Sequence, residues 1–192
     1  MAITRLGGAN AITGVIPTSV GGTGSTAATL PASLINDTSI SNITALPAGV
    51  GGKVLQVVNA TFGTATTSSS STFADLGLSA SITPSSTSNK ILVTVHLSGC
   101  QKNNNALLGT RLLRGSTTIY TIDNMSLYTA TTNENACGSV STSYLDSPST
   151  TSATTYKVQF RSVTNVSYVY INNDYSGGSS SNITLMEIAG WY

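Results

Sequence analysis

Alternation of apolar and polar residues along the chain predicts a series of β-strands. The clearest example is residues 90–97, where one set of side chains is fully apolar: Ile91, Val93, Val95 and Leu97. Leu92, Thr94 and His96 occupy the positions between them. Successive side chains of a strand point to opposite faces, so the first set forms one apolar face. Such a face needs a second layer to cover it, which indicates two packed layers.

Further strands are predicted at residues 53–62, 73–82, 107–114, 117–122, 137–145, 156–163, 167–171 and 183–188. Gly115 and Ser116 favour a hairpin between the third and fourth of these. Residues 64–72 form a polar connection, and residues 183–188 are apolar on both faces, as in a central or interface strand. About eight to nine short strands without a competing helical pattern predict an all-β fold. We expect an antiparallel jelly-roll sandwich over residues 51–192.

Residues 1–50 have a different pattern. Short apolar pieces such as Ala11-Ile12 and Val15-Ile16 are separated by glycines and prolines, including the run Gly21-Gly22-Thr23-Gly24. Turn-forming residues at this density disfavour a compact core. We therefore expect an extended N-terminal arm that becomes ordered by lying on neighbouring proteins. A disordered linker is the alternative.

The composition is unusually poor in charge: only 8% of the 192 residues are charged, and the formal net charge is +1. Serine and threonine take the place of charged residues, which suits strands and turns. No basic run could follow a phosphate backbone, so nucleic acid is not an expected partner. A weakly charged surface is poorly protected against self-association, which suggests that subunits cover part of it.

The chain shows no signs of export or membrane insertion. Its first residues lack the pattern of a secretory signal, and no stretch approaches the roughly 18 apolar residues of a membrane span. Cys100 and Cys137 are expected to be small buried thiols in a protein assembled in the cytoplasm. A disulfide between them is the alternative.

Residues that could carry catalysis are sparse. No two carboxylates lie close together on one strand face, so an acid–base pair is not indicated. His96 lies opposite the apolar face of its strand without an adjacent acid or thiol, which favours a structural or surface role over a triad or a metal site. We expect a non-enzymatic protein without cofactor or metal. The carboxylates are expected to be solvated turn residues: Asp37, Asp75, Asp123, Glu134, Asp146, Asp174 and Glu187.

Glu187 is a separate case because apolar residues flank it, Met186 on one side and Ile188 on the other. If its face is buried, the carboxylate requires a partner such as Arg111, Arg114 or a symmetry mate. If its face lies at an edge, no partner is required.

Three tyrosines are the candidate ligand contacts: Tyr168, Tyr170 and Tyr175. Aromatic faces stack on sugar rings, and the amides of nearby Asn172 and Asn173 could bond sugar hydroxyls. The alternative is that tyrosine is a good strand residue whose polar tip reaches water. The turn at residues 103–105, three successive asparagines, is a further candidate contact of a common loop composition.

Two parts of the chain resemble bacteriophage proteins. Residues 16–26, with Gly21-Gly22-Thr23-Gly24, resemble segments near the starts of phage tail-fibre proteins, although Ser19-Val20 stands where alanine-asparagine is usual. Residues 81–97 and 181–188 resemble a C-terminal β domain of phage structural proteins. In those families the domain is a jelly roll similar to the tumour necrosis factor fold and is usually trimeric. The resemblance implies a virion component.

We therefore expect a phage virion structural protein, a tail fibre or fibre-like subunit assembled in the host cytoplasm. Residues 1–50 would dock to other virion proteins, and residues 51–192 would form a homotrimer. A capsid decoration (cement) protein is the alternative. A carbohydrate-binding or sugar-degrading module that recognises a host surface glycan is a further alternative.

Overall fold

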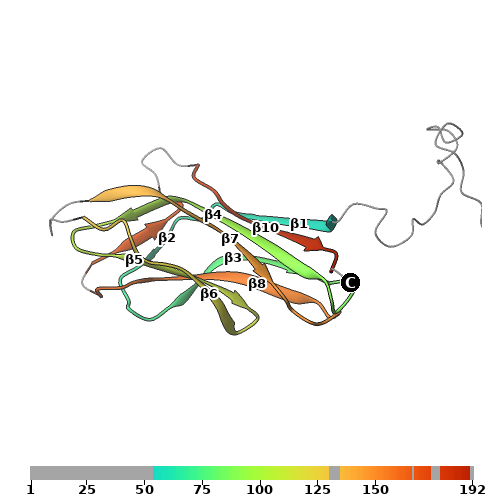
Figure 1. The fold of residues 1–192 in the computed structure, drawn as a ribbon. Helices are drawn as coiled ribbons and strands as arrows, with labels where there is room; N and C mark the ends of the chain where they lie inside the picture. Colours follow the sequence, from blue (N-terminus) through green and yellow to red (C-terminus); the bar gives the residue numbers. More distant parts are fainter. Residues whose placement is uncertain (1–53, 130–134, 166, 174–177, 191–192) are drawn as a thin grey trace, which may run out of the picture. The chain divides into compact units, whose positions relative to one another are not determined.

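The computed structural model describes residues 54–129, 135–165, 167–173 and 178–190. Within these ranges the chain forms ten β-strands arranged in two layers (Figure 1). The predicted arm, residues 1–50, lies outside the described residues.

Sheet A is organised around its longest strand, β4 (Lys90–Lys102). One side of β4 pairs with β10 (Ser181–Ile188) and then with β9 (Val169–Ile171), and its other side pairs with β7 (Ala136–Asp146). Beyond these, β1 (Val54–Phe62) pairs with β10, and β2 (Thr66–Ser68) pairs with β9. Sheet B has the order β3 (Ala74–Ile82), β8 (Thr154–Ser162), β5 (Leu108–Arg114) and β6 (Thr117–Ser126). Every pairing is antiparallel.

The strand order is that of a jelly roll. Without the three-residue strands β2 and β9, sheet A runs β1-β10-β4-β7 and sheet B runs β3-β8-β5-β6. The first and last of these eight strands are neighbours, and the chain crosses between the sheets in the nested way of two Greek keys. The predicted all-β jelly-roll sandwich is confirmed. β2 lies within residues 64–72, which were expected to form a polar connection. The strand was not predicted because its three residues all carry hydroxyl groups and show no alternation of apolar and polar side chains.

The core lies between the sheets and has the predicted composition. On β4, Ile91, Val93 and Leu97 have no exposed surface, which confirms the apolar face expected for this strand. On β8, which was predicted as a strand at residues 156–163, alternate side chains are likewise buried: Tyr156, Val158 and Phe160. Burial of large apolar side chains is the main favourable term in folding, so these two strands anchor the layers to each other.

β4 continues to Lys102, beyond its predicted end at Leu97. The prediction ended there because a bulge reverses the alternation of inward and outward side chains. The register with β7 shifts between Leu97 and Cys100, and Gly99 adopts a left-handed φ of 55°. A Cβ on Gly99 would lie 2.8 Å from the backbone N of Asn173, so no larger residue fits there. After the bulge, Cys100 and Lys102 face inward, although a continuous alternation would have turned them outward.

The hairpin predicted around Gly115 and Ser116 is present between β5 and β6. Gly115 has a φ of 59°, which a glycine adopts without steric cost.

Glu187 is fully buried, so its interpretation as a solvated residue is wrong. Its Oε1 accepts hydrogen bonds from the backbone N of Ser85 at 2.6 Å, from Ser85 Oγ at 2.8 Å and from Asn89 Nδ2 at 2.6 Å. Its Oε2 accepts one from Gln56 Nε2 at 2.6 Å. Asn89 in turn accepts from the backbone N of Gly190 at 3.0 Å. We call these residues the Glu187 cluster: Gln56, Ser85, Asn89, Glu187 and Gly190.

The two arginines proposed as partners of a buried Glu187 are also wrong, because neither reaches it. Arg111 donates to Gln159 Oε1 and stacks over the ring of Phe73, and Arg114 is paired with Asp146. Neutral donors satisfy the carboxylate instead. Burial acts to raise the pKa of Glu187, but the hydrogen bonds from Gln56, Asn89 and Ser85 outweigh it and hold the pKa below its usual value.

Replacing Glu187 by Gln should destabilise the fold. The substitution keeps the size of the side chain but turns an NH₂ group toward groups that are themselves donors. We expect the free energy of unfolding to fall by about 2–3 kcal/mol, measured by urea denaturation. Asp75→Asn is the control, since Asp75 is an exposed carboxylate paired with Lys157, and should cost less than about 1 kcal/mol. Equal losses in the two variants would contradict the structural role of Glu187.

The same variant should be less sensitive to acid. Because the folded-state pKa of Glu187 is lowered, its ionised form stabilises the fold above the unfolded-state pKa of about 4.3. That contribution is lost as the pH falls through the folded-state pKa. Between pH 5 and pH 3 the unaltered protein should therefore lose stability more steeply than Glu187→Gln. Asp75 and Asp123, whose pKa values are also lowered, retain a slope in both proteins. Parallel curves would count against this assignment.

Candidate functional site

The outer face of sheet A changes from apolar to polar along the strands. Antiparallel register places Val57 opposite Met186, Met186 opposite Leu92, and Leu92 opposite Leu145. Opposed residues in adjacent strands point to the same side of a sheet, so these four form one row across β1, β10, β4 and β7. Ile188 and its partner Val54 extend the row toward the start of β1. We call these residues the apolar band: Val54, Val57, Leu92, Leu145, Met186 and Ile188.

The apolar band is open to solvent in a single chain. Val57 is 57% exposed, Leu145 is 55% exposed and Val54 is 49% exposed. Leu55, in the irregular start of β1, is exposed beside them. No residue of β1 is charged, although edge strands usually carry charges that prevent pairing with other chains. The other members of the band, Leu92, Met186 and Ile188, are half-buried. An apolar row at a protein surface is typical of an interface.

The next rows of the same face are polar. Asn59, Thr184, Thr94 and Ser143 form one row, and Thr61, Asn182, His96 and Ser141 form the next. A shallow hollow of about 380 Å³ lies over this region, lined by Thr94, Val95, His96, Ser141, Thr142, Ser143 and Asn182. The apolar band therefore ends abruptly at a surface of hydroxyls and amides.

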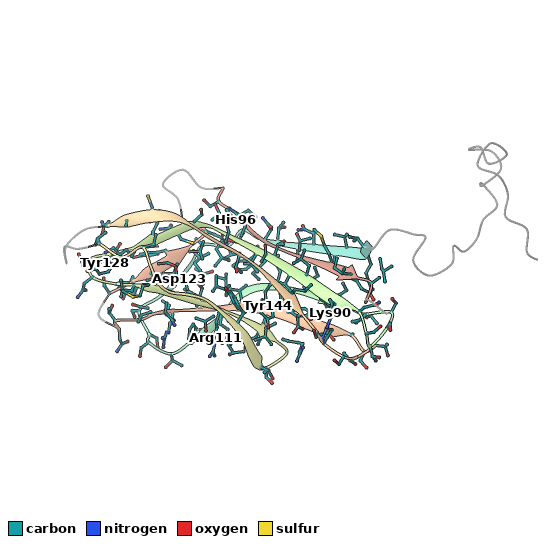
Figure 2. The ribbon with its side chains drawn as sticks, viewed as in Figure 1. Lys90, His96, Arg111, Asp123, Tyr128 and Tyr144 are labelled. Atoms are coloured by element: carbon teal, nitrogen blue, oxygen red, sulfur yellow. The ribbon has the colours of Figure 1, made fainter. Side chains whose placement is uncertain are left out.

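His96 lies on the outer face of β4, as the alternation predicts. Its Nδ1 is 2.8 Å from Ser141 Oγ, and the residue is half-buried in the upper layer of Figure 2. None of the described carboxylates is hydrogen-bonded to it. An imidazole and a hydroxyl without an orienting acid do not make up a catalytic triad.

Asp146 is the second carboxylate for which the expectation of a solvated turn is wrong. It is 5% exposed and accepts two hydrogen bonds from Arg114 Nη1, at 2.9 and 2.8 Å, and one from Tyr156 Oη at 2.6 Å. The pKa of the Tyr156 hydroxyl is raised well above its usual value, mainly by burial and secondly by the hydrogen bond to Asp146. The group ties β7 to β5 and β8 across the two sheets, which is a structural task.

The other described carboxylates are near the surface. Asp75 is exposed and contacts Lys157 Nζ at 2.8 Å, and Asp123 accepts a hydrogen bond from the backbone N of Met125 at 2.8 Å. Asp37, Glu134 and Asp174 lie outside the described residues. Among the described residues, no three histidine, cysteine or acidic side chains gather in a way that could hold a metal ion.

Two of the three candidate tyrosines are brought together. The ring centroids of Tyr168 and Tyr170 are 6.3 Å apart with planes tilted by 35°, and Tyr168 is 50% exposed. Asn103 Nδ2 donates to Tyr170 Oη at 3.1 Å, so the asparagine turn belongs to the same surface. Tyr175 lies outside the described residues.

Asn172 cannot serve as a ligand contact in the way its sequence position suggested. It is 5% exposed, its Nδ2 donates to the carbonyl of Phe62 at 2.8 Å, and its Oδ1 accepts from Ser181 Oγ at 2.6 Å. Its φ of 58° is left-handed, a conformation that asparagine tolerates better than most residues. Asn172 therefore has a structural role, although it is close to the tyrosines in sequence.

No protein-family model matches the chain, and no curated protein matches it significantly. Within the described ranges, no helix has the length and hydropathy needed to cross a membrane.

The two cysteines are free, and only one is buried as expected. Cys100 has no exposed surface, whereas Cys137 is exposed, so the expectation of a buried thiol is wrong for Cys137. Cys137 opposes Gln101 rather than Cys100 in the β4–β7 register. Neighbouring residues of a strand face opposite sides, which places the two thiols on opposite faces of sheet A. Burial raises the pKa of Cys100 to about 12.

One thiol should therefore react in the native protein and the other only after unfolding. We expect a thiol reagent such as iodoacetamide at pH 8 to modify Cys137 first, as followed by intact mass. Cys100 should react only in denaturant, because its thiolate is both inaccessible and disfavoured. Cys137→Ser should remove the fast phase and Cys100→Ser should leave it unchanged. Two fast thiols, or none in denaturant without reductant, would contradict this assignment.

Proposed function

We propose that this protein is a non-enzymatic structural subunit of a bacteriophage virion, a tail fibre or fibre-like protein that self-associates through its β domain. The observation that carries the proposal is the apolar band. It crosses four strands on the outer face of sheet A, which the core does not use. A face of this kind is expected to be covered in the working assembly.

Physical considerations favour a second copy of the chain as the cover. Burying the remaining surface of a half-exposed valine or leucine contributes roughly 1 kcal/mol, so one band supplies only a few kcal/mol. Association costs more than that, and a closed ring meets the cost by burying one band in every subunit. A homotrimer fits both this reasoning and the resemblance of residues 81–97 and 181–188 to trimeric phage domains.

Residues 1–50 take the role of a docking arm in this proposal. Their composition supports an extended segment that binds other virion proteins. The chain enters the described sandwich at Val54, which is itself a member of the apolar band. An oligomer closed over the band would bring the Val54 positions of its subunits close together, as a fibre attached at its base requires.

The proposal predicts the mass of the full-length chain in solution. Light scattering after size-exclusion chromatography should give three times the 19.6 kDa of one chain. Val57→Asp or Leu145→Asp should shift the mass to that of a monomer, because either variant buries an unpaired charge in the interface. Far-UV circular dichroism checks that each variant keeps its fold.

Ser143→Asp is the matched control. Ser143 is exposed on the same strand and face as Leu145 but belongs to the first polar row. It should leave the trimer mass unchanged. A monomeric mass for the unaltered chain would refute self-association. If Ser143→Asp disrupted the trimer as much as Leu145→Asp does, the interface could not be assigned to the band.

The place of the protein in the particle is tested by quantitative mass spectrometry of purified virions. Tens of copies per particle are expected for a tail fibre. Hundreds of copies would overturn that assignment and favour capsid decoration by the same trimer. Absence from particles would refute the virion role.

A further inference from the structure

The end of the sandwich opposite the apolar band carries a second surface of different chemistry. β4 runs from Lys90, beside the band, to Lys102, which immediately precedes the asparagine turn. At about 3.3 Å per residue, Asn103 lies roughly 35 Å from Leu92. In Figure 2, Lys90 lies toward one end of the sandwich and Tyr128 lies at the other. A partner that covers the band therefore leaves this end accessible.

We propose that this end binds an uncharged carbohydrate on a platform formed by Tyr168 and Tyr170, with Asn103 and its neighbouring amides as hydrogen-bonding partners. The site is separate from the apolar band, and the proposal does not depend on the oligomeric state.

The two tyrosine rings supply the stacking surface. Their centroids lie 6.3 Å apart and their planes are tilted by 35°, so the two rings are close neighbours rather than isolated side chains. Tyr168 is half exposed, and Tyr170 sits on β9 with its neighbours Val169 and Ile171 buried in the core. A sugar ring presents C–H groups that pack on such aromatic faces.

The platform is held in place before any ligand arrives. Asn103 Nδ2 donates to Tyr170 Oη at 3.1 Å, and the backbone N of Asn103 donates to the carbonyl of Tyr168 at 3.0 Å. The turn is closed by the backbone N of Ala106, which donates to the carbonyl of Asn103 at 3.1 Å. Ligand binding then requires little additional ordering, which favours affinity.

Amides surround the platform. Asn104 and Asn105 are exposed, and Gln101 and Asn173 are linked by a reciprocal pair of hydrogen bonds. An amide offers a donor and an acceptor on one side chain, which matches the donor and acceptor of a sugar hydroxyl.

The charge of the neighbouring lysine is directed away from this surface. Lys102 is 1% exposed, and its Nζ donates to the carbonyl of Asn104 and to Thr129 Oγ1. Its ammonium group is therefore used to support the turn from within. Acidic sugars and phosphates are usually recognised by exposed arginine or lysine, so a ligand without charge is favoured.

The test measures binding of the full-length protein to defined oligosaccharides in solution by saturation-transfer NMR and calorimetry. The probes are neutral hexose and N-acetylhexosamine oligomers, first identified on a glycan array, and uronic acid oligomers of matched length. We expect binding to a neutral probe only. If the protein bound none of the neutral probes, or bound only the acidic ones, the proposal would be overturned.

Variants then assign the binding to the platform. Tyr168→Ala should weaken the affinity about tenfold or more, and Tyr168→Phe should keep most of it, because the ring face provides the contact. Tyr128→Ala is the control: Tyr128 is 62% exposed at the same end but has no ring partner among the described residues. An equal loss in Tyr128→Ala, or none in Tyr168→Ala, would refute the assigned site.

The outcome is independent of the proposed self-association. Leu145→Asp should keep the solution affinity of each site for the neutral probe, whereas Tyr168→Ala should keep the trimer mass. A trimer without sugar binding would refute this inference alone, and a sugar-binding monomer would refute the proposed assembly alone.

Discussion

The arrangement of sheet A depends on one buried carboxylate, that of Glu187. An anion without exposed surface is costly unless donors surround it, and here four hydrogen bonds reach it from Gln56, Ser85 and Asn89. These donors come from β1 and from the connection that precedes β4, while the carboxylate itself lies on β10. The cluster therefore fixes the edge strand and the loop against the centre of the sheet. It also secures the end of the sandwich at which the apolar band lies.

This constraint connects the inner face of the sheet to the outer one. Because Glu187 points inward, its neighbours Met186 and Ile188 must point outward, where they join Leu92 and Val57 in the band. Further along β4, the bulge at Gly99 reverses the alternation and turns Cys100 and Lys102 inward. The buried Lys102 then supports the asparagine turn with its ammonium group instead of exposing a charge. The two ends of one strand thus acquire different surface chemistry.

The alternation of single strands was readable from the sequence, and the relation between strands was not. A period of two identified the buried faces of β4 and β8 because each strand carries its own pattern. The partners of Glu187 lie 98 to 131 residues away along the chain, and nothing local distinguishes Ser85 or Asn89 from other turn residues. The apolar band is equally non-local: Val57 and Leu145 are unremarkable in their own strands and form a row only through register. The expectation that Asn172 contacts a ligand is wrong for the converse reason, since its side chain contacts Phe62 and Ser181 and not its neighbours in sequence.

Low charge links the band to the tyrosine platform. With 8% charged residues, the protein has few charges to keep β-strand surfaces apart, which favours the proposed self-association through the band. Its polar surface is hydrated mainly through hydroxyls and amides. The outer face of sheet A divides along this line, with the apolar row at one end and serine, threonine and asparagine beyond it. A surface hydrated by neutral groups exchanges water for sugar hydroxyls without desolvating an ion, whereas an ionic ligand would find no exposed charged side chain among the described residues of the platform. The same composition that favours self-association at one end therefore favours an uncharged ligand at the other.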